Sequence, residues 1–106
     1  MAGLATPGRR DDVEVSWFVY VVVLERGRNR GAFMEALAAR GVPTRAYFPP
    51  LHLQDYLRRR GCGNTAKGDL PVTEDLTART VALPFHGQMT QDEIGQVADA
   101  CREALA

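Results

Sequence analysis

Residues 13–24 read VEVSWFVYVVVL, and this pattern is the clearest strand prediction in the chain. Successive side chains of a strand point to opposite faces, and here both faces are apolar. One face carries Val15, Trp17, Val19, Val21 and Val23, and the other carries Phe18, Tyr20, Val22 and Leu24. Such a strand is expected at the centre of a sheet with both sides covered. Helices of this chain can cover one face, and the other is expected to need a cover from outside this sequence.

The segments after this strand alternate between helical and extended patterns. Helices are predicted from Asn29 to about Arg40, from Thr73 to about Arg79, and from a capping box at Thr90–Glu93 to about Leu105. Short strands are predicted at 44–48 and 81–83, and one or two helical turns at 54–60. The last helix has an apolar stripe formed by Ile94, Val97, Ala98, Cys101 and Leu105.

These elements predict one α+β domain. We expect a small, mainly antiparallel sheet of about three strands with helices packed on one face. Residues 1–12, with the turn signal Pro7-Gly8 and a charged run, are expected to be a lead-in to a domain spanning 13–106.

Composition narrows the class of protein. The 106 residues have a formal net charge of zero, so nothing favours nucleic acid or an anionic membrane as a partner. No apolar run is long enough to cross a bilayer, and Met1–Arg10 lacks the apolar core of a signal peptide. Cys62 and Cys101 stand apart, which favours a reducing, cytoplasmic setting.

A second stretch, Arg45–Gln54, reads RAYFPPLHLQ and is the candidate site. Its adjacent prolines remove two backbone donors and fix φ near −65°, so the segment continues neither a helix nor the inside of a sheet. A stiff aromatic loop of this kind presents side chains to a ligand. The alternative is a connector whose aromatic residues cover a hydrophobic edge.

The chain offers contact residues but no complete catalytic set. His52 and His86 are its only histidines, and each could act as an acid, a base or a hydrogen-bond donor, although His86 is expected simply to bond to backbone. Zinc ligation by the two histidines with Cys62 and Cys101 is not expected, because their spacing matches no compact metal motif. We therefore predict no catalytic, cofactor-binding or metal-binding residue in this chain.

Several motifs resemble one family in order and spacing. They are Gly41–Gln54 followed by Tyr56, the strand Trp17–Val21, the run Leu70–Leu76, Val81–His86, and Met89–Ile94. Together they cover roughly residues 13–105. They resemble the C-terminal domain of the DegT/StrS family, pyridoxal phosphate (PLP)-dependent aminotransferases that act mostly on nucleotide-linked keto-sugars.

The resemblance implies an aminotransferase small domain without its N-terminal PLP-binding domain. In the family that domain supplies the lysine that binds PLP, and the enzyme is expected to be a homodimer. Lys67, the only lysine here, matches no family motif and is not expected to bind PLP. Tyr47 and His52, and more weakly Arg45, are the groups that the resemblance places near a nucleotide-sugar substrate.

The parent enzyme would pass an amino group from an amino acid to the keto-sugar, and the fragment alone is expected to be inactive. Two other interpretations remain: a stand-alone small-ligand binding module, and an interaction domain that oligomerises through the open face of its sheet.

Overall fold

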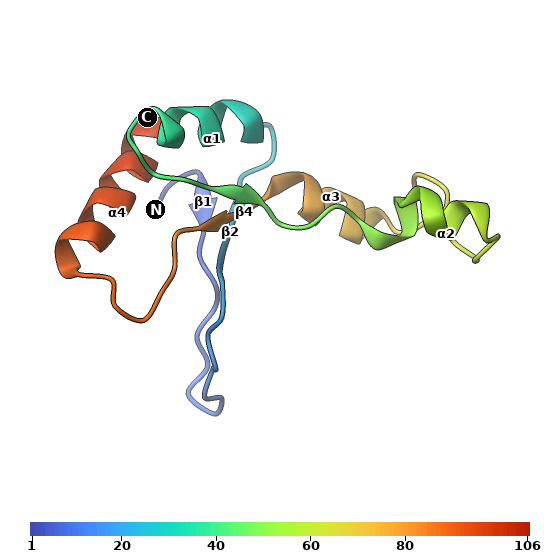
Figure 1. The fold of residues 1–106 in the computed structure, drawn as a ribbon, viewed down its shortest axis with the longest axis horizontal. Coiled ribbons are helices and arrows are strands. Elements are labelled where there is room, and N and C mark those ends of the chain that lie inside the picture. The colour runs from blue at the N-terminus through green and yellow to red at the C-terminus, as the bar shows by residue number, and fades with distance from the viewer.

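A four-stranded antiparallel sheet carries two helices on one face (Figure 1). The computed structural model describes residues 1–106. The strands, in sheet order, are β1 (Leu4–Ala5), β2 (Tyr20–Leu24), β4 (Thr80–Leu83) and β3 (Arg45–Ala46). The helices are α1 (Arg30–Ala38), α2 (Asp55–Arg59), α3 (Pro71–Arg79) and α4 (Gln91–Leu105), with a 3₁₀ turn η1 at Leu51–Leu53. The predicted class is confirmed, with one strand more than the three expected.

The core lies between the sheet and the helices α1 and α4. In the longest pairing Tyr20 faces Leu83, and Val22 faces Val81. The side chains of Val22 and Val81 are fully buried. The buried apolar residues are Leu4, Val22, Leu24, Phe33, Leu37, Val42, Val81, Ala100, Cys101 and Leu105. Only one face of β2 therefore enters the core, whereas Val21 and Val23 on its other face are half-buried.

Two helix starts follow the sequence prediction. The Asn29 side chain accepts a hydrogen bond from the Ala32 amide at 3.0 Å. Thr90 and Glu93 form the predicted capping box, in which the Thr90 oxygen accepts from the Glu93 amide and the Glu93 carboxylate accepts from the Thr90 amide. Both caps satisfy amides that the helix itself leaves without partners.

The strand predicted over 13–24 is shorter than expected. Pairing begins only at Tyr20, and residues 6–19 form an arm that leaves the sheet and returns to it (Figure 1). On this arm Phe18 is 81% exposed, and Val13, Val15 and Trp17 are also exposed. Residues 13–19 have strand-like alternation, but their only backbone hydrogen bond is the one that the Val13 amide donates to the Arg10 carbonyl oxygen at the turn of the arm.

Three other expectations need correction. The lead-in at 1–12 contains β1, where Leu4 pairs with Leu24 and is buried, so part of that segment belongs to the sheet. The strand predicted at 44–48 is reduced to Arg45–Ala46, because the two prolines that follow have no amide to donate. The third helix begins at Pro71, and Thr73 does not cap it.

The chain is extended for its size. Its radius of gyration is 16.0 Å, whereas a compact domain of this length has about 13 Å. The arm projects from one side of the sheet, and η1, α2 and α3 project from another (Figure 1). Only 12 of the 106 residues are buried, so much of the apolar surface has no cover within the chain.

Candidate functional site

The candidate stretch leaves the sheet at β3 and runs out along the projection to η1, which immediately precedes α2 (Figure 1). Arg45 is exposed and lies opposite Ala82 in the sheet. Tyr47 is half-buried, and its ring stacks on that of Phe48 with centroids 4.1 Å apart. The Thr80 hydroxyl donates to the Tyr47 carbonyl oxygen. Tyr47 is therefore fixed through its backbone and through a neighbouring aromatic ring.

His52 lies in η1 and is the only buried polar or charged side chain of the chain, at 8% exposure. Its Nε2 atom lies 3.3 Å from the Glu74 Oε2 atom, but the two groups are not aligned as a hydrogen bond. Neither ring nitrogen has a hydrogen-bond partner within the chain. A buried polar atom without a hydrogen-bond partner lowers the stability of the fold by about 1–3 kcal/mol. Two such nitrogen atoms on one ring are therefore unusual in a small domain.

Glu74 holds the start of α3 in place of a conventional cap. Its carboxylate oxygens accept from the Gly68 amide at 2.8 and 2.9 Å and from the Leu70 amide at 3.2 Å. The Gly68 amide outweighs the opposing effect of partial burial and holds the pKa of the Glu74 carboxyl below its ordinary value. The carboxylate is therefore a fixed negative charge that joins the residue 61–70 loop to His52.

A surface depression of about 360 Å³ lies between the proline segment and α3. Its lining residues are Arg30, Ala46, Phe48, Pro49, Pro50, Leu53, Lys67, Glu74, Thr77 and Ala78. None of the three predicted contact residues, Arg45, Tyr47 and His52, is among them. The structure thus places these three residues around the same segment at different depths and does not gather them in one pocket.

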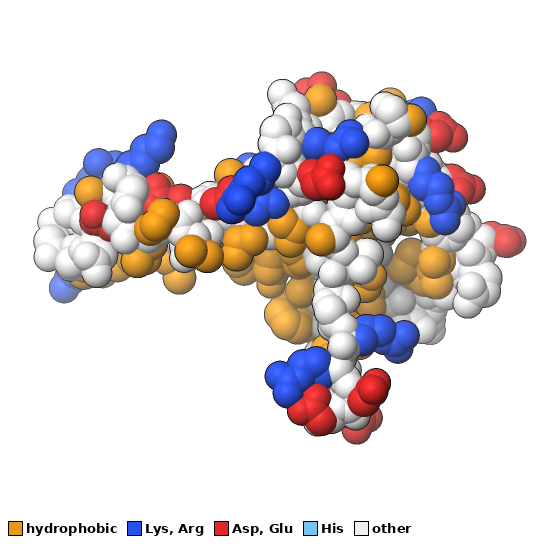
Figure 2. Space-filling view, turned by 180° about the vertical axis from the view of Figure 1, so that it is seen from behind, with side chains coloured by type: hydrophobic (Ala, Val, Ile, Leu, Met, Phe, Trp, Pro, Cys, Tyr) orange, Lys and Arg blue, Asp and Glu red, His pale blue; other side chains and the backbone are white.

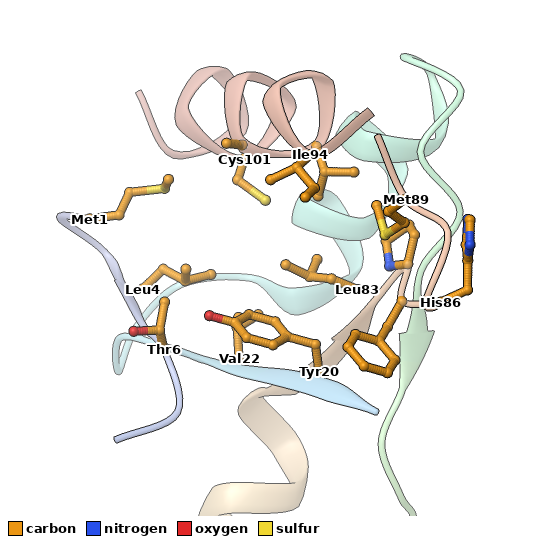
Figure 3. A pocket seen from close by; sticks show the side chains of 14 residues that line it. Met1, Leu4, Thr6, Tyr20, Val22, Leu83, His86, Met89, Ile94 and Cys101 are labelled. Carbon is orange, nitrogen blue, oxygen red and sulfur yellow. The ribbon is translucent and has the colours of Figure 1, made fainter. Parts of the chain in front are cut away.

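An apolar groove of about 460 Å³, which the sequence did not indicate, lies between the sheet and α4 (Figure 3). Tyr20, Val22 and Leu83 line it from the sheet, and Ile94 and Cys101 line it from α4. Ile94 is 46% exposed although it belongs to the predicted apolar stripe. Only the C-terminal half of that stripe is buried, which leaves the N-terminal half of α4 open toward the sheet.

The remaining candidate groups behave as ordinary structural residues. His86 is exposed, and its Nδ1 atom accepts from the Gln88 amide at 3.3 Å, as expected. Cys101 is a buried core residue, as predicted, and burial raises the pKa of its thiol. Cys62 is exposed and unpaired. No three His, Cys, Asp or Glu side chains gather as a metal site, and every helix is too short or too polar to span a membrane.

Comparison with known proteins assigns the fold to a family. The model described as the DegT/DnrJ/EryC1/StrS aminotransferase family matches residues 2–102. The chain is 30% identical over 109 aligned positions to the uncharacterized protein MJ1066 of Methanocaldococcus jannaschii, covering 100% of this chain and 28% of that protein. It is 28% identical over 107 positions to the spore coat polysaccharide biosynthesis protein SpsC of Bacillus subtilis, covering 97% of this chain and 27% of that protein.

A solved structure of a family member supports the same assignment. The crystal structure of a DegT DnrJ EryC1 StrS aminotransferase from Brucella abortus superposes with a TM-score of 0.82 at 27% identity, covering 98% of this chain and 26% of that chain. The chain therefore spans about a quarter of the length of the relatives that it matches. Because the family model covers nearly all of its residues, this chain belongs to the DegT/DnrJ/EryC1/StrS aminotransferase family.

Proposed function

We propose that this chain is the substrate-side domain of a cytoplasmic PLP-dependent aminotransferase that moves an amino group from an amino acid to a nucleotide-linked keto-sugar. Two facts taken together carry the proposal. The family model matches nearly all of this chain, and the chain corresponds to only about a quarter of the length of its relatives. On this proposal the chain supplies substrate contacts, and the rest of the enzyme supplies the cofactor. Alone, it is inactive.

The residues of the chain do not fit covalent binding of PLP. The only lysine, Lys67, is exposed and lines the surface depression, whereas a lysine that binds a cofactor covalently is usually buried or flanked by another cation. Glu74, in the same depression, is already engaged by the Gly68 and Leu70 amides. Both the lysine and the acidic partner of the cofactor would therefore come from an N-terminal PLP-binding domain.

The uncovered apolar surface supports such a partner. Hydrophobic side chains form a band along one edge of the α2–α3 projection and onto the body of the molecule (Figure 2). Phe18, Phe48, Leu51, Tyr56 and Val72 are each more than 60% exposed. An apolar surface of this extent is typical of an interface and unusual for a monomer. We assign it to the N-terminal domain and to the second subunit of a homodimer.

The proposal of a carbohydrate substrate is supported by the name of one relative. The Bacillus subtilis protein is named for spore coat polysaccharide biosynthesis. In this chain Tyr47 is a half-buried aromatic residue, Arg45 is an exposed arginine two residues before it, and His52 is a buried histidine five residues after it. An aromatic ring suits the apolar face of a sugar, and an arginine suits a diphosphate. We propose these three as the substrate-side residues.

Complementation tests the proposal. The N-terminal three-quarters of the Brucella abortus enzyme, without its own matching region, is purified with PLP and mixed with this chain. We expect a complex on size-exclusion chromatography and recovery of glutamate-dependent amination of a nucleotide-linked keto-sugar, with neither part active alone. A chain that neither binds this domain nor restores any turnover contradicts the proposal.

Covalent trapping tests the cofactor assignment separately. The isolated chain is incubated with PLP, reduced with borohydride and examined by mass spectrometry, with Lys67→Ala as the matched control. We expect no stoichiometric pyridoxyl adduct that depends on Lys67. Such an adduct would show that this chain can carry the cofactor itself.

A further inference from the structure

We infer that Glu74 is a positioning residue that holds the His52 ring as the Nε2–H tautomer and leaves Nδ1 as a hydrogen-bond acceptor. The juxtaposition behind this inference is the 3.3 Å separation of His52 Nε2 and Glu74 Oε2 in a buried setting. Only the use of Nδ1 by a substrate rests on the proposed function.

The orientation of Glu74 is fixed independently of His52. Its carboxylate accepts from the Gly68 and Leu70 amides, which belong to the loop that enters α3. A charge held by two backbone amides cannot turn away from the ring without breaking those bonds. His52 therefore meets an acceptor oxygen whose position is set by the backbone.

The tautomer follows from the donor and acceptor capacity of the two groups. An ionised carboxylate only accepts, whereas a neutral imidazole has one donor nitrogen and one acceptor nitrogen. With the proton on Nδ1, the Nε2 lone pair would face the carboxylate, and a buried N–H would have no acceptor. With the proton on Nε2, that N–H group lies 3.3 Å from a carboxylate oxygen that attracts it, although the two groups are not aligned as a hydrogen bond. The negative carboxylate attracts an N–H group at Nε2 and repels a lone pair there, and this difference favours the Nε2–H form.

The tautomer defines what His52 can recognise. A free Nδ1 lone pair accepts from a hydroxyl or N–H group and gives no hydrogen bond to a phosphate oxygen. If His52 meets the substrate of the proposed function, its partner is a sugar hydroxyl or an amine and not the diphosphate. Both ring nitrogens are inaccessible to solvent, so a substrate can reach Nδ1 only if the residues around the His52 ring move.

Nitrogen-15 NMR of the labelled imidazoles tests the inference in the full 106-residue chain. Long-range ¹H–¹⁵N spectra are recorded at alkaline pH, where imidazole is neutral. His52 is expected to show one protonated Nε2 and one unprotonated Nδ1. In Glu74→Gln a single amide oxygen faces three donors, namely the Gly68 and Leu70 amides and the His52 Nε2–H group. We therefore expect the single-tautomer pattern to be lost. The wild-type spectrum decides the question even if the variant fails to fold: a protonated Nδ1 or an even mixture overturns the inference.

Glu93→Gln is the matched control. Glu93 also accepts a backbone amide at a helix start, but it lies on α4 and does not contact His52. The control is expected to leave the His52 pattern unchanged, and His86→Gln assigns the two imidazoles. A change in His52 in Glu93→Gln equal to that in Glu74→Gln would mean a general loss of structure and would remove the positioning role. This readout needs neither cofactor nor substrate, so its failure is separate from failure of the complementation experiment.

Discussion

Glu74 and Asp75 are adjacent acidic residues in the first half of α3, yet their carboxylates have different partners. Glu74 binds loop amides and faces His52, whereas Asp75 binds Arg79 at 2.6 and 3.1 Å and Arg26 at 3.2 Å. Hydrogen bonds from Arg79 first, and then from Arg26, lower the pKa of Asp75 to about 2. Acidic residues near a helix start also interact favourably with its positive end, so that interaction is only part of the role of these two residues.

The lowered pKa of Asp75 predicts a loss of stability in acid. Because the folded pKa lies below the unfolded value of 3.8, this contribution is complete above about pH 4 and is lost as the pH falls toward 2. Asp75→Asn should lower the free energy of unfolding at neutral pH and flatten its decline between pH 4 and 2. The decline should not vanish, because the pKa values of Glu74 and Glu93 are also lowered.

Urea unfolding at a series of pH values measures this effect. Asp99→Asn is the matched control, since Asp99 has only an exposed pair with Arg102 on α4. An Asp75→Asn profile parallel to that of the wild type across the acid range would show that the Arg79 and Arg26 contacts do not stabilise the fold.

At the scale of elements, α3 and α4 begin in different ways. The side chain of Thr90 caps α4, as the sequence predicts. At α3 the residue before the helix is Leu70, which cannot cap, and the Glu74 side chain reaches back to the loop amides instead. Thr73, the predicted cap, lies inside the first turn and is exposed.

Two threonine substitutions distinguish these starts. Thr90→Ala should destabilise the chain by about 1 kcal/mol, the usual effect of losing a cap. Thr73→Ala should change the free energy of unfolding by less than about 0.5 kcal/mol, as for other exposed positions. Circular dichroism during urea unfolding gives both values, and equal losses would mean that Thr73 also caps a helix.

At the scale of the molecule, a small core carries two projections. The core lies between one face of the sheet and two helices, whereas the arm and the α2–α3 projection expose large apolar side chains. Marginal stability is therefore expected for the isolated chain, together with self-association through its uncovered surface.

A pair of phenylalanine substitutions tests this division. Phe18 on the arm is 81% exposed, and Phe33 in the core is 4% exposed. Phe18→Ala should reduce self-association in sedimentation experiments and leave the unfolding free energy within about 0.5 kcal/mol. Phe33→Ala should cost about 3–5 kcal/mol and unfold much of the population. If Phe18→Ala destabilises the chain as strongly as Phe33→Ala, the arm is part of the folded core.

The candidate site was only partly predictable. The motif around Arg45–Gln54 predicted the candidate segment, and its two prolines account for its departure from the sheet. The different depths of Arg45, Tyr47 and His52 could not be read from their order, because depth depends on which distant element lies above each residue. The sequence did not reveal that Glu74 lies next to His52. A usable signal was present, because Leu70 has no side chain that can cap the helix, and a glutamate four residues later can accept hydrogen bonds from the uncapped amides.

The sequence by itself determined the class of fold, the central position of β2, the caps of α1 and α4, and the burial of Cys101. These depend on local spacing and on hydrogen bonds between near neighbours, which residue types specify directly. The tertiary structure alone decided that pairing starts at Tyr20, that Leu4 adds a fourth strand, and that His52 is buried beside Glu74. Each of these requires a partner far along the chain, and an apolar alternation without a neighbouring strand to accept its hydrogen bonds does not become a strand.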